Sequence, residues 1–385
     1  MGDYSDEILS SVRTPCYVVS EDAILRNCLI IDGVQRRTGA RILLALKAFA
    51  LPAVFPIIGK YLHGVCASGP IEARLGREEF GREVHTYAPA FTDEQMGRVI
   101  EYSDHIVFNS VAQWHKHRAR VAAAGQGKSA GLRVNPGHSE VEIDLYNPCI
   151  PGSRFGVSPE DLGGVNLSGI EGLHFHALCE QGADVLGRVL DSFVARFGHL
   201  VPGMKWVNFG GGHHITKPGY DVDLLCDIIA RFQRRFPGVQ VYLEPGEAVV
   251  YDAGVFVTTV LDTVRNGVDV AVVDSSAETH APDVLAMPYR PMIVGSGLPG
   301  AKPYTYKIGG ISCLAGDFFG SYSFDQPLAP GDRLVFTDMA LYSFVKSTTF
   351  NGVELPSIYT CSGGGAVLNL VRSFGYEDYK SRISQ

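Results

Sequence analysis

Short apolar runs alternate with longer amphipathic stretches between residue 21 and about residue 251. The runs predicted as strands are residues 41–46, 64–67, 83–86, 105–108, 131–134, 172–175, 206–209 and 240–243. The stretches predicted as helices include residues 21–37, 72–80, 93–102, 111–124, 183–196 and 222–236. Because apolar strands that alternate with helices form parallel sheets, eight such steps favour a (β/α)8 TIM-type barrel.

The helix predicted at 222–236 has the clearest pattern. Leu224, Leu225, Ile228, Ile229 and Phe232 fall on one face at helical spacing, and the following Pro237-Gly238 pair ends the helix. One face of this helix is therefore expected to pack against the barrel strands.

Beyond Asp252 the alternation of strands with helices stops. Residues 255–260, 268–273, 304–308 and 333–337 have strand character, with turns rich in Gly, Pro and Asp and little helix between them. The early run at 15–19 has the same character. We therefore expect a barrel domain at 21–251 and a second, all-β domain at 252–385 that also takes in a strand from residues 1–20.

Composition and charge argue against several classes of protein. Acidic residues outnumber basic ones, 41 against 33, for a net charge of −8, whereas nucleic-acid-binding surfaces are basic. The longest apolar stretch, 42–58, is interrupted by Lys47, Pro52 and Pro56, so no membrane span is expected. The polar residues 1–11 lack the apolar core of a secretory signal. Eight cysteines without a CxxC pair predict free thiols in a reducing cytoplasm.

Candidate chemistry follows four of the predicted strands. Lys47 ends the first strand, His176 follows the sixth, Gly210-Gly211-Gly212 follows the seventh, and Glu244 follows the eighth. In barrels of this kind the active site is built where the strands end, at their carboxyl side. All four features should therefore converge on one rim.

Each feature also has a simpler interpretation. A lone lysine at a strand end can extend its amine to water. The glycine run could be a flexible turn, Glu244 could cap the turn before Pro245, and His176 could be an ordinary core histidine. Read singly, Lys47 and His176 favour these simpler roles.

Taken together, the four features predict a site for pyridoxal 5′-phosphate (PLP). Lys47 would be a desolvated amine of lowered pKa, suited to binding the cofactor's aldehyde. The glycine amides would hold the phosphate. Glu244 would keep a proton on the pyridine nitrogen, and His176 would lie flat against the ring.

At these residues the chain resembles the fold-type III PLP-dependent decarboxylases, the group that contains alanine racemase, diaminopimelate decarboxylase and ornithine decarboxylase. Within the group it is most similar to the carboxynorspermidine/carboxyspermidine decarboxylase branch. The motifs that carry the resemblance are LALKAF (44–49), DLYNPCIPGSRFG (144–156), HFHALCEQ (174–181), FGGGHH (209–214), LEPGE (243–247), CLAGD (313–317) and DMALYSFVKSTTFNG (338–352).

The resemblance implies roles for individual residues. Lys47 would bind the cofactor covalently, His176 would stack on its ring, and Glu244 would pair with its nitrogen. Gly211 and Gly212 would supply phosphate-binding amides, the Gly246-Glu247 turn would bind the cofactor beside them, and Tyr342 would reach the phosphate. Cys313 would reprotonate the substrate carbon. In relatives this cysteine comes from the partner subunit, so the resemblance implies a homodimer with active sites at the interface.

Three departures from the family pattern bear on the substrate. Ornithine and diaminopimelate decarboxylases have an acidic residue after the catalytic cysteine, where this chain has Leu314. Glu247 replaces the usual arginine after Glu-Pro-Gly, and Cys179 stands near the place of a phosphate-binding serine. The first change disfavours ornithine and diaminopimelate as substrates, and the other two remove phosphate contacts that relatives make.

Other residues are candidates for the substrate itself. Glu180 and Asp317 could hold the amines of a long triamine, or they could be solvated loop carboxylates. Arg154 and Arg290 could bind the substrate carboxylate or serve an interface.

The resemblance implies decarboxylation of carboxynorspermidine to norspermidine, of carboxyspermidine to spermidine, or of both, in polyamine biosynthesis. A diaminopimelate, ornithine or arginine decarboxylase of the same fold is the first alternative. A non-catalytic PLP-binding regulator is another, although such a chain would be expected to lose Lys47 or Cys313.

A metal-dependent barrel hydrolase is the remaining alternative. His174 and His176 at a strand end, with His213, His214 and Asp274, could supply ligands for a divalent ion. This interpretation gives Lys47 and the glycine triplet no role, so we expect no metal.

Overall fold

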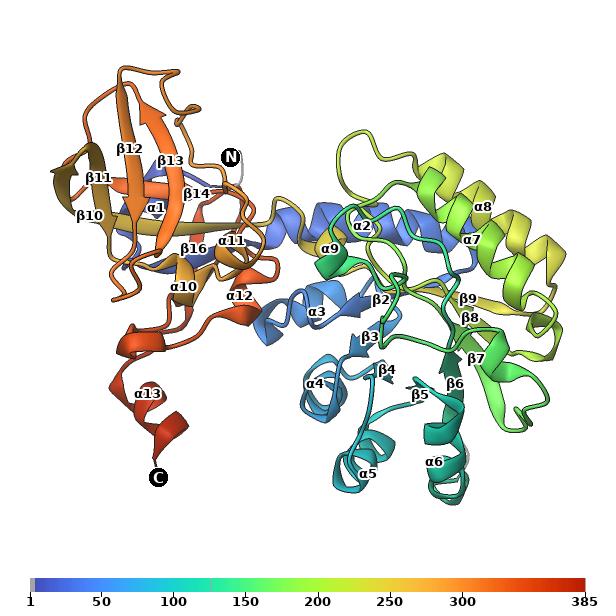
Figure 1. Ribbon diagram of the computed structural model, residues 1–385. Coiled ribbons are helices and arrows are strands. Elements are labelled where there is room, and N and C mark those ends of the chain that lie inside the picture. Colours follow the sequence, from blue (N-terminus) through green and yellow to red (C-terminus); the bar gives the residue numbers. More distant parts are fainter. Residues whose placement is uncertain (1–3, 126, 385) are drawn as a thin grey trace. The chain divides into compact units, whose positions relative to one another are not determined.

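The computed structural model describes residues 4–125 and 127–384. They form two compact units (Figure 1). The first unit is Arg26–Val249. The second consists of the described parts of Met1–Leu25 and Val250–Gln385.

The first unit is a closed barrel of eight parallel strands, which confirms the predicted fold class. The strands are β2 (Arg41–Ala45), β3 (Gly64–Ala67), β4 (Glu83–Tyr87), β5 (His105–Phe108), β6 (Ser129–Arg133), β7 (Ile170–His174), β8 (Trp206–Asn208) and β9 (Gln240–Leu243). Each strand pairs with the next in sequence, and β9 pairs with β2 to close the ring.

Helices follow most of the strands, as Figure 1 shows. They are α3 (Phe55–Ile58), α4 (Pro70–Leu75), α5 (Asp93–Tyr102), α6 (Val111–Ala123), α7 (Ala183–Phe197), α8 (Val222–Arg235) and α9 (Glu247–Val250), and α2 (Glu21–Thr38) precedes β2. The helix predicted at 72–80 is two elements, because α4 runs into a π-helical turn at Gly76–Phe80. In α8 the apolar stripe is buried as predicted, except that Leu224, also on that stripe in sequence, is not fully buried.

Two glycines lie inside barrel strands and make room for an indole. The sequence pattern began strands at Gly131 and Gly172, but β6 and β7 each start two residues earlier. A Cβ atom at either glycine would collide with the ring of Trp206. The indole fills this part of the barrel interior, and its Nε1 donates to Ser129 Oγ at 2.9 Å. Glycine is therefore required here by packing.

The second unit is built on a mixed sheet with the order β13-β12-β11-β10-β1-β15-β16, and β14 pairs with β10. Its strands are β1 (Cys16–Ser20), β10 (Gly254–Asn266), β11 (Val268–Val273), β12 (Tyr304–Gly309), β13 (Phe318–Phe324), β14 (Arg333–Phe336), β15 (Ser357–Ser362) and β16 (Val367–Arg372). The N-terminal strand β1 lies between antiparallel β10 and parallel β15.

The second unit is a β domain, as predicted, and most of its strand pairs are antiparallel. It also contains the short helices α1 (Asp6–Ser11), α10 (Ala277–His280), α11 (Asp283–Ala286), α12 (Ser343–Lys346) and α13 (Tyr376–Ile383). Four to eight residues give too little periodicity for a helix to be recognised in sequence.

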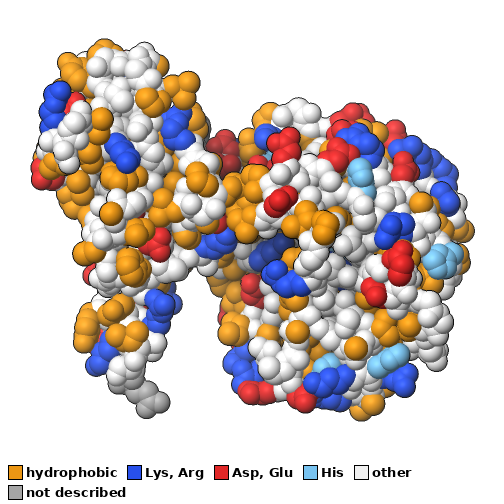
Figure 2. Space-filling view, viewed as in Figure 1, with side chains coloured by type: hydrophobic (Ala, Val, Ile, Leu, Met, Phe, Trp, Pro, Cys, Tyr) orange, Lys and Arg blue, Asp and Glu red, His pale blue; other side chains and the backbone are white. Residues whose placement is uncertain are grey.

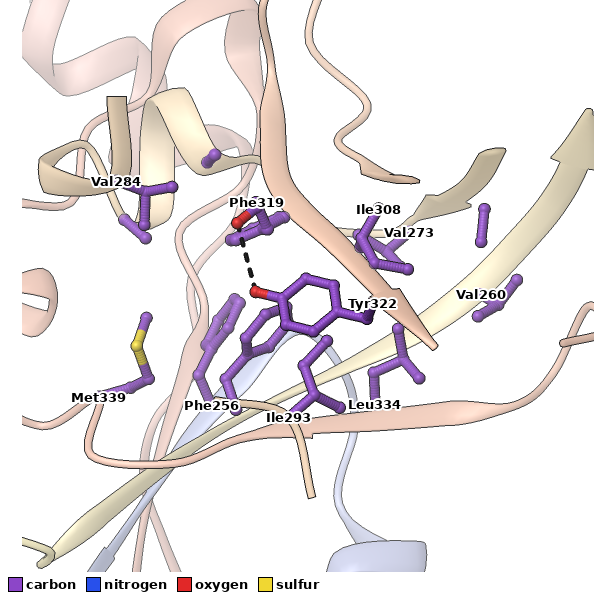
Figure 3. Close-up of a cluster of buried hydrophobic side chains, with 14 of the residues drawn as sticks. Phe256, Val260, Val273, Val284, Ile293, Ile308, Phe319, Tyr322, Leu334 and Met339 are labelled. Atoms are coloured by element: carbon purple, nitrogen blue, oxygen red, sulfur yellow. Dashed lines mark hydrogen bonds between the residues drawn. The ribbon is translucent and has the colours of Figure 1, made fainter. Parts of the chain in front are cut away.

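Aromatic side chains form the centre of this unit (Figure 3). Phe256, Phe319 and Phe336 are fully buried and lie within ring-contact distance of one another, with centroids 4.8 to 6.5 Å apart. The buried Tyr322 hydroxyl donates to the carbonyl of Pro291 at 2.7 Å. A buried phenol normally needs such a partner. This core gives β10, β13 and β14 a common packing face.

Three further predictions from the sequence concern surface charge, membrane spans and the cysteines. On the face drawn in Figure 2, acidic and basic side chains are interspersed over the barrel unit. Among the described helices, none combines the length and apolar character that crossing a bilayer requires. All eight cysteines lie in the described residues, and each is a free thiol.

Candidate active site

The parallel barrel places the four predicted strand-end features at one mouth. Because all eight strands run in one direction, the residues that follow them lie at the same end. The backbone links these ends directly: the Ala45 amide donates to the Pro245 carbonyl at 3.2 Å, and the Glu244 amide donates to the Gly210 carbonyl at 2.8 Å. The turns after β2, β8 and β9 are therefore neighbours.

Lys47 lies in the turn just beyond β2, and its side chain is exposed. The sequence interpretation expected a desolvated amine, and the exposure corrects it. The amine is nevertheless close enough to His176 to contribute to the low pKa of that imidazole. An accessible amine beside the site can reach an aldehyde group bound there.

Glu244 carries a largely buried carboxylate. Its Oε1 accepts a hydrogen bond from Asn208 Nδ2 at 2.7 Å, and its Oε2 lies 3.3 Å from His174 Nε2. Burial alone would raise the pKa of Glu244, but His174, His85 and the Asn208 donor together lower it to about 2. The group is therefore ionised at neutral pH, as required of a carboxylate that holds a proton on a pyridine nitrogen.

His176 is tied to the glycine turn. The Gly211 amide donates to His176 Nδ1 at 2.8 Å, so the proton of the neutral ring lies on Nε2. Burial, followed by the cations Lys47 and Arg133, keeps the pKa of His176 well below its ordinary value. Because the Gly211 amide is already bonded, the prediction that it holds a phosphate needs correction. Among the described residues, no partner accepts a hydrogen bond from the Gly212 amide, which remains a candidate.

Glycine is required at two of these positions. Gly212 has φ +83°, and a Cβ atom there would collide with the Leu178 carbonyl. At Gly246 a Cβ atom would collide with Ala48 in the turn that carries Lys47. Backbone at both positions can therefore approach a bound group more closely than any larger residue would allow.

Glu247 does not replace the family arginine as a phosphate partner. Its carboxylate bonds to His214 Nε2 at 2.9 Å, and the Glu180 carboxylate lies within 4.8 Å of both groups. Partial burial and the charge of Glu247 raise the pKa of Glu180. The side chains of Glu180 and Glu247 therefore form an acidic corner of the mouth, which suits a cation better than a phosphate.

Arg133 is a site residue that sequence analysis missed. Its guanidinium is buried, lies 4.6 and 4.5 Å from the ring centroids of Tyr87 and Phe155, and donates to the His176 carbonyl at 3.3 Å. A charged residue within a predicted core strand was the available signal, because such a residue is rarely buried without a function.

Arg154 lies in the loop that follows β6, at the same end of the barrel. Its exposed guanidinium stacks on Phe155 with Cζ 4.4 Å from the ring centroid. The backbone carbonyl of Arg154 accepts a hydrogen bond from Asn109 Nδ2 at 2.8 Å. This cation is therefore held in place and open to a ligand.

Cys313 and Asp317 lie in the second unit and share one loop. Cys313 is exposed, and its amide donates to Asn351 Oδ1 at 2.7 Å. Asp317 is buried, and its carboxylate accepts hydrogen bonds from the amides of Ala277, Glu278 and Ser312 at 2.7, 3.2 and 3.1 Å. The prediction that Asp317 binds a substrate amine needs correction, because its oxygens already hold the backbone beside Cys313.

Tyr342 and Arg290 also belong to the second unit. Tyr342 precedes α12 with φ +42°, a conformation that non-glycine residues adopt at a cost and that often marks functional positions. The Arg290 guanidinium lies 4.7 Å from the Tyr322 ring centroid and donates to the Gly297 carbonyl at 3.5 Å. These contacts give Arg290 a structural role, which argues against its predicted role in binding the substrate.

The ligand set of the metal-hydrolase alternative does not assemble. Of its five residues only His214 belongs to a described group close enough to share an ion, and its companions there are Glu180 and Glu247. Asp274 lies in the second unit and accepts hydrogen bonds from Thr14 and Thr258.

A family model described as "Pyridoxal-dependent decarboxylase, C-terminal sheet domain" matches residues 16–340. The chain belongs to the pyridoxal-dependent decarboxylase family.

Two relatives and one solved structure are similar to this chain over nearly its whole length. The chain is 43% identical to a carboxynorspermidine/carboxyspermidine decarboxylase of Campylobacter jejuni, with 96% of this chain and 98% of the relative covered. It is also 43% identical to a carboxyaminopropylagmatine decarboxylase of Synechocystis, covering 97% and 96%. A crystal structure of carboxynorspermidine decarboxylase from Campylobacter jejuni, complexed with norspermidine, superposes with a TM-score of 0.89 at 42% identity, covering 96% and 100%.

Enzymes of the pyridoxal-dependent decarboxylase family use PLP, and the residues at this mouth fit that cofactor. The carboxylate of Glu244 accepts a hydrogen bond from the Asn208 amide and lies 3.3 Å from His174, but no lysine or arginine among the described residues forms an ion pair with it, so a protonated pyridine nitrogen would provide a cationic partner. The positive-φ glycine turn supplies backbone for a phosphate. The amine of Lys47 is exposed for an aldehyde.

Proposed function

We propose that this PLP-dependent decarboxylase removes carbon dioxide from carboxynorspermidine, from carboxyspermidine, or from both, and forms norspermidine or spermidine in polyamine biosynthesis. The observation that carries the proposal is the ionised Glu244 at the same mouth as Lys47, His176 and the glycine turn. The similarity to the Campylobacter jejuni relative supports this choice of substrates.

When bound, PLP supplies a conjugated ring that accepts the electron pair left behind by carbon dioxide. Lys47 provides the amine that binds the aldehyde and later releases the product. His176 would lie against the ring, and the amides of Gly212 and Gly246 would hold the phosphate. Glu244 keeps the proton on the pyridine nitrogen, and this proton makes the ring a strong electron acceptor.

Arg154 binds the substrate carboxylate, because its guanidinium is both anchored on Phe155 and exposed. The acidic corner of Glu180 and Glu247 attracts the ammonium groups of the triamine. Leu314 takes the place where family members that bind a short diamine carry an acidic residue, so the distal amine of this substrate is recognised elsewhere.

Cys313 delivers the proton to the carbon that has lost carbon dioxide, and Tyr342 contacts the cofactor phosphate. In this proposal the enzyme is a cytoplasmic homodimer, and Cys313 comes from the partner subunit. Mixing a Lys47→Ala variant with a Cys313→Ala variant tests this arrangement. Recovery of part of the activity on mixing is expected, and no recovery after subunit exchange would contradict shared sites.

A second candidate substrate is carboxyaminopropylagmatine, because the Synechocystis relative is equally similar to this chain. Carbon dioxide release is measured with carboxynorspermidine, carboxyspermidine and carboxyaminopropylagmatine, and with ornithine, arginine and diaminopimelate as controls. The first two should be the best substrates by kcat/KM. A higher value for any of the others would reassign the substrate, and no release from all six would favour the non-catalytic PLP-binding alternative.

The role of Lys47 has its own test. The absorbance band of lysine-bound PLP should be present in the wild-type protein and absent in Lys47→Ala. The Lys60→Ala variant, which changes another lysine of the barrel unit, should keep the band. An unchanged yellow chromophore in Lys47→Ala would refute the assignment.

A further inference from the structure

Asn208 is a fully buried amide at the end of β8 that joins two parts of the mouth. Its Nδ2 donates to Glu244 Oε1 at 2.7 Å, and its Oδ1 accepts from the Gly210 amide at 2.8 Å. One side chain thus contacts both the carboxylate proposed for the pyridine nitrogen and the first residue of the glycine turn. Both of its polar ends are used within the site.

The bond to Glu244 favours the charged form of that carboxylate. An amide N–H remains a donor at every pH at which the protein is folded, and a hydrogen bond to a charged acceptor is stronger than one between neutral groups. Burial opposes the charge on Glu244, and the Asn208 donor is one of the groups that offset this penalty. The other titratable or charged groups that face Glu244 are His174, with Nε2 3.3 Å from Oε2, and His85, the Cys66 thiol and the Arg133 guanidinium.

The bond to Gly210 fixes where the glycine turn begins. Gly210 has φ +73°, and its carbonyl accepts hydrogen bonds from the Glu244 amide at 2.8 Å and from His213 Nε2 at 3.1 Å. The next amide along the chain, that of Gly211, reaches His176. A shift of Gly210 would therefore move the histidine contact and the backbone proposed for the phosphate.

We propose that Asn208 is a positioning residue that couples the charge and orientation of Glu244 to the shape of the phosphate turn. The inference rests on the proposed function, since it assigns Asn208 a part in holding PLP at both ends. The role proposed for Asn208 differs from a purely structural role in one respect. A structural amide stabilises the fold, whereas this one also sets how cofactor binding depends on pH.

The Asn208→Asp substitution separates the two bonds. A carboxylate keeps an acceptor for the Gly210 amide but removes the donor to Glu244 and places a second negative charge beside it. Two adjacent carboxylates share one proton, so the pKa of the pair rises. As pH falls from 8 to 6 the shared proton restores a hydrogen-bonded, singly charged pair, and the defect should shrink.

The measurement is the affinity of the cofactor-free protein for PLP, titrated by absorbance between pH 6 and 8. For Asn208→Asp we expect affinity about tenfold weaker than wild type at pH 8, the cost of one charge-assisted hydrogen bond, and a smaller deficit at pH 6. Asn208→Ala removes both bonds without adding charge, so its deficit should be similar at every pH.

Two further variants serve as controls. In Asn27→Asp the change is made at another buried amide of the barrel unit, whose Nδ2 donates to the Val249 carbonyl at 3.2 Å. This variant should keep wild-type affinity for PLP and its pH dependence. The Asn208→Asp/Glu244→Gln double variant reverses donor and acceptor, so it should recover thermal stability and bind PLP while staying inactive.

Wild-type affinity and pH dependence in Asn208→Asp would overturn the inference. So would a deficit in Asn208→Asp that stays the same between pH 6 and pH 8. Should Asn208→Asp not fold, the double variant and Asn208→Ala carry the same comparison, and unchanged PLP affinity in Asn208→Ala would overturn it. Failure of the proposed function is a separate result, because it would appear as no carbon dioxide release by the wild-type enzyme.

Discussion

The Gly211 amide donates a hydrogen bond to Nδ1 of His176 at 2.8 Å. This contact joins the turn after β8 to the residue that follows β7, and it fixes both the tautomer and the orientation of the imidazole. The ring expected to face the cofactor is therefore held by the backbone of the phosphate turn. Changes in that turn should affect the histidine even where the imidazole itself is untouched.

Gly211→Ala tests this contact. The added Cβ atom would collide with the Glu244 carbonyl, so the turn must move and the bond to His176 is lost. We expect destabilisation of about 2 kcal/mol and PLP affinity at least about tenfold weaker. Thermal denaturation and PLP titration measure both effects. Gly203→Ala is the matched control, because a Cβ atom there meets no neighbour within 4 Å. Equal behaviour of the two variants would contradict the prediction.

Glu244→Gln keeps the size of the side chain but removes its charge. The variant should bind PLP, and its kcat should fall by about 10² to 10³, because a neutral amide cannot stabilise a proton on the pyridine nitrogen. Steady-state carbon dioxide release checks this. Glu79→Gln, at an exposed position of the same unit, should leave kcat unchanged. A Glu244→Gln variant with wild-type kcat would remove Glu244 from the mechanism.

Asp317→Ala should destabilise the second unit without requiring any contact with substrate. Three backbone amides lose a buried charged acceptor, so we expect a loss of about 3 kcal/mol. Asp325→Ala breaks only the exposed ion pair with Lys302 and should cost less than about 1 kcal/mol. Thermal melts of the two variants give the comparison. A stable Asp317→Ala variant with a raised KM would instead restore the role in substrate binding.

Variants of Arg154 and Arg290 should differ in kcat/KM and in melting temperature. Arg154→Ala should lower kcat/KM by about 10- to 100-fold with little change in melting temperature, because its exposed guanidinium is proposed to bind the substrate carboxylate. Arg290→Ala should lower the melting temperature and leave kcat/KM near the wild-type value, because it loses its contact with Tyr322. The reverse pattern would exchange the two roles.

Buried histidines make stability depend on pH. Burial lowers the pKa of His213 to about 4, so as pH falls the unfolded chain binds the proton before the folded protein does. The free energy of unfolding should therefore decrease between about pH 6.5 and pH 4, by about 3 kcal/mol from this group. Burial lowers the pKa of His280 to about 4 as well, so the two contributions add.

Denaturant unfolding at a series of pH values measures this slope. His213→Gln should reduce the slope by about one proton, whereas the exposed His199→Gln should leave it unchanged. An unaltered slope in His213→Gln would show that His213 is already charged in the folded protein at these pH values.

The barrel and the positions of Lys47, His176, the glycine triplet and Glu244 followed from the sequence. Their order depends on local periodicity: apolar strands alternate with amphipathic helices, and the polar or glycine residues of the site begin within two residues of the ends of four strands. In a parallel barrel, strand ends share a rim, so a one-dimensional pattern was enough to predict which residues meet. Strands β13, β15 and β16 were not predicted, and in β16 most residues are exposed and do not alternate.

The tertiary structure decided which atoms pair across the strands. That Asn208 bonds to Glu244, that His176 takes the Gly211 amide, and that Asp317 holds three amides depend on register and side-chain direction. The same is true of the buried Arg133 between two aromatic rings. Sequence spacing fixes where a residue stands along a strand. Which neighbours satisfy its hydrogen bonds is settled only when folding removes water and leaves each buried polar group with the few partners within reach.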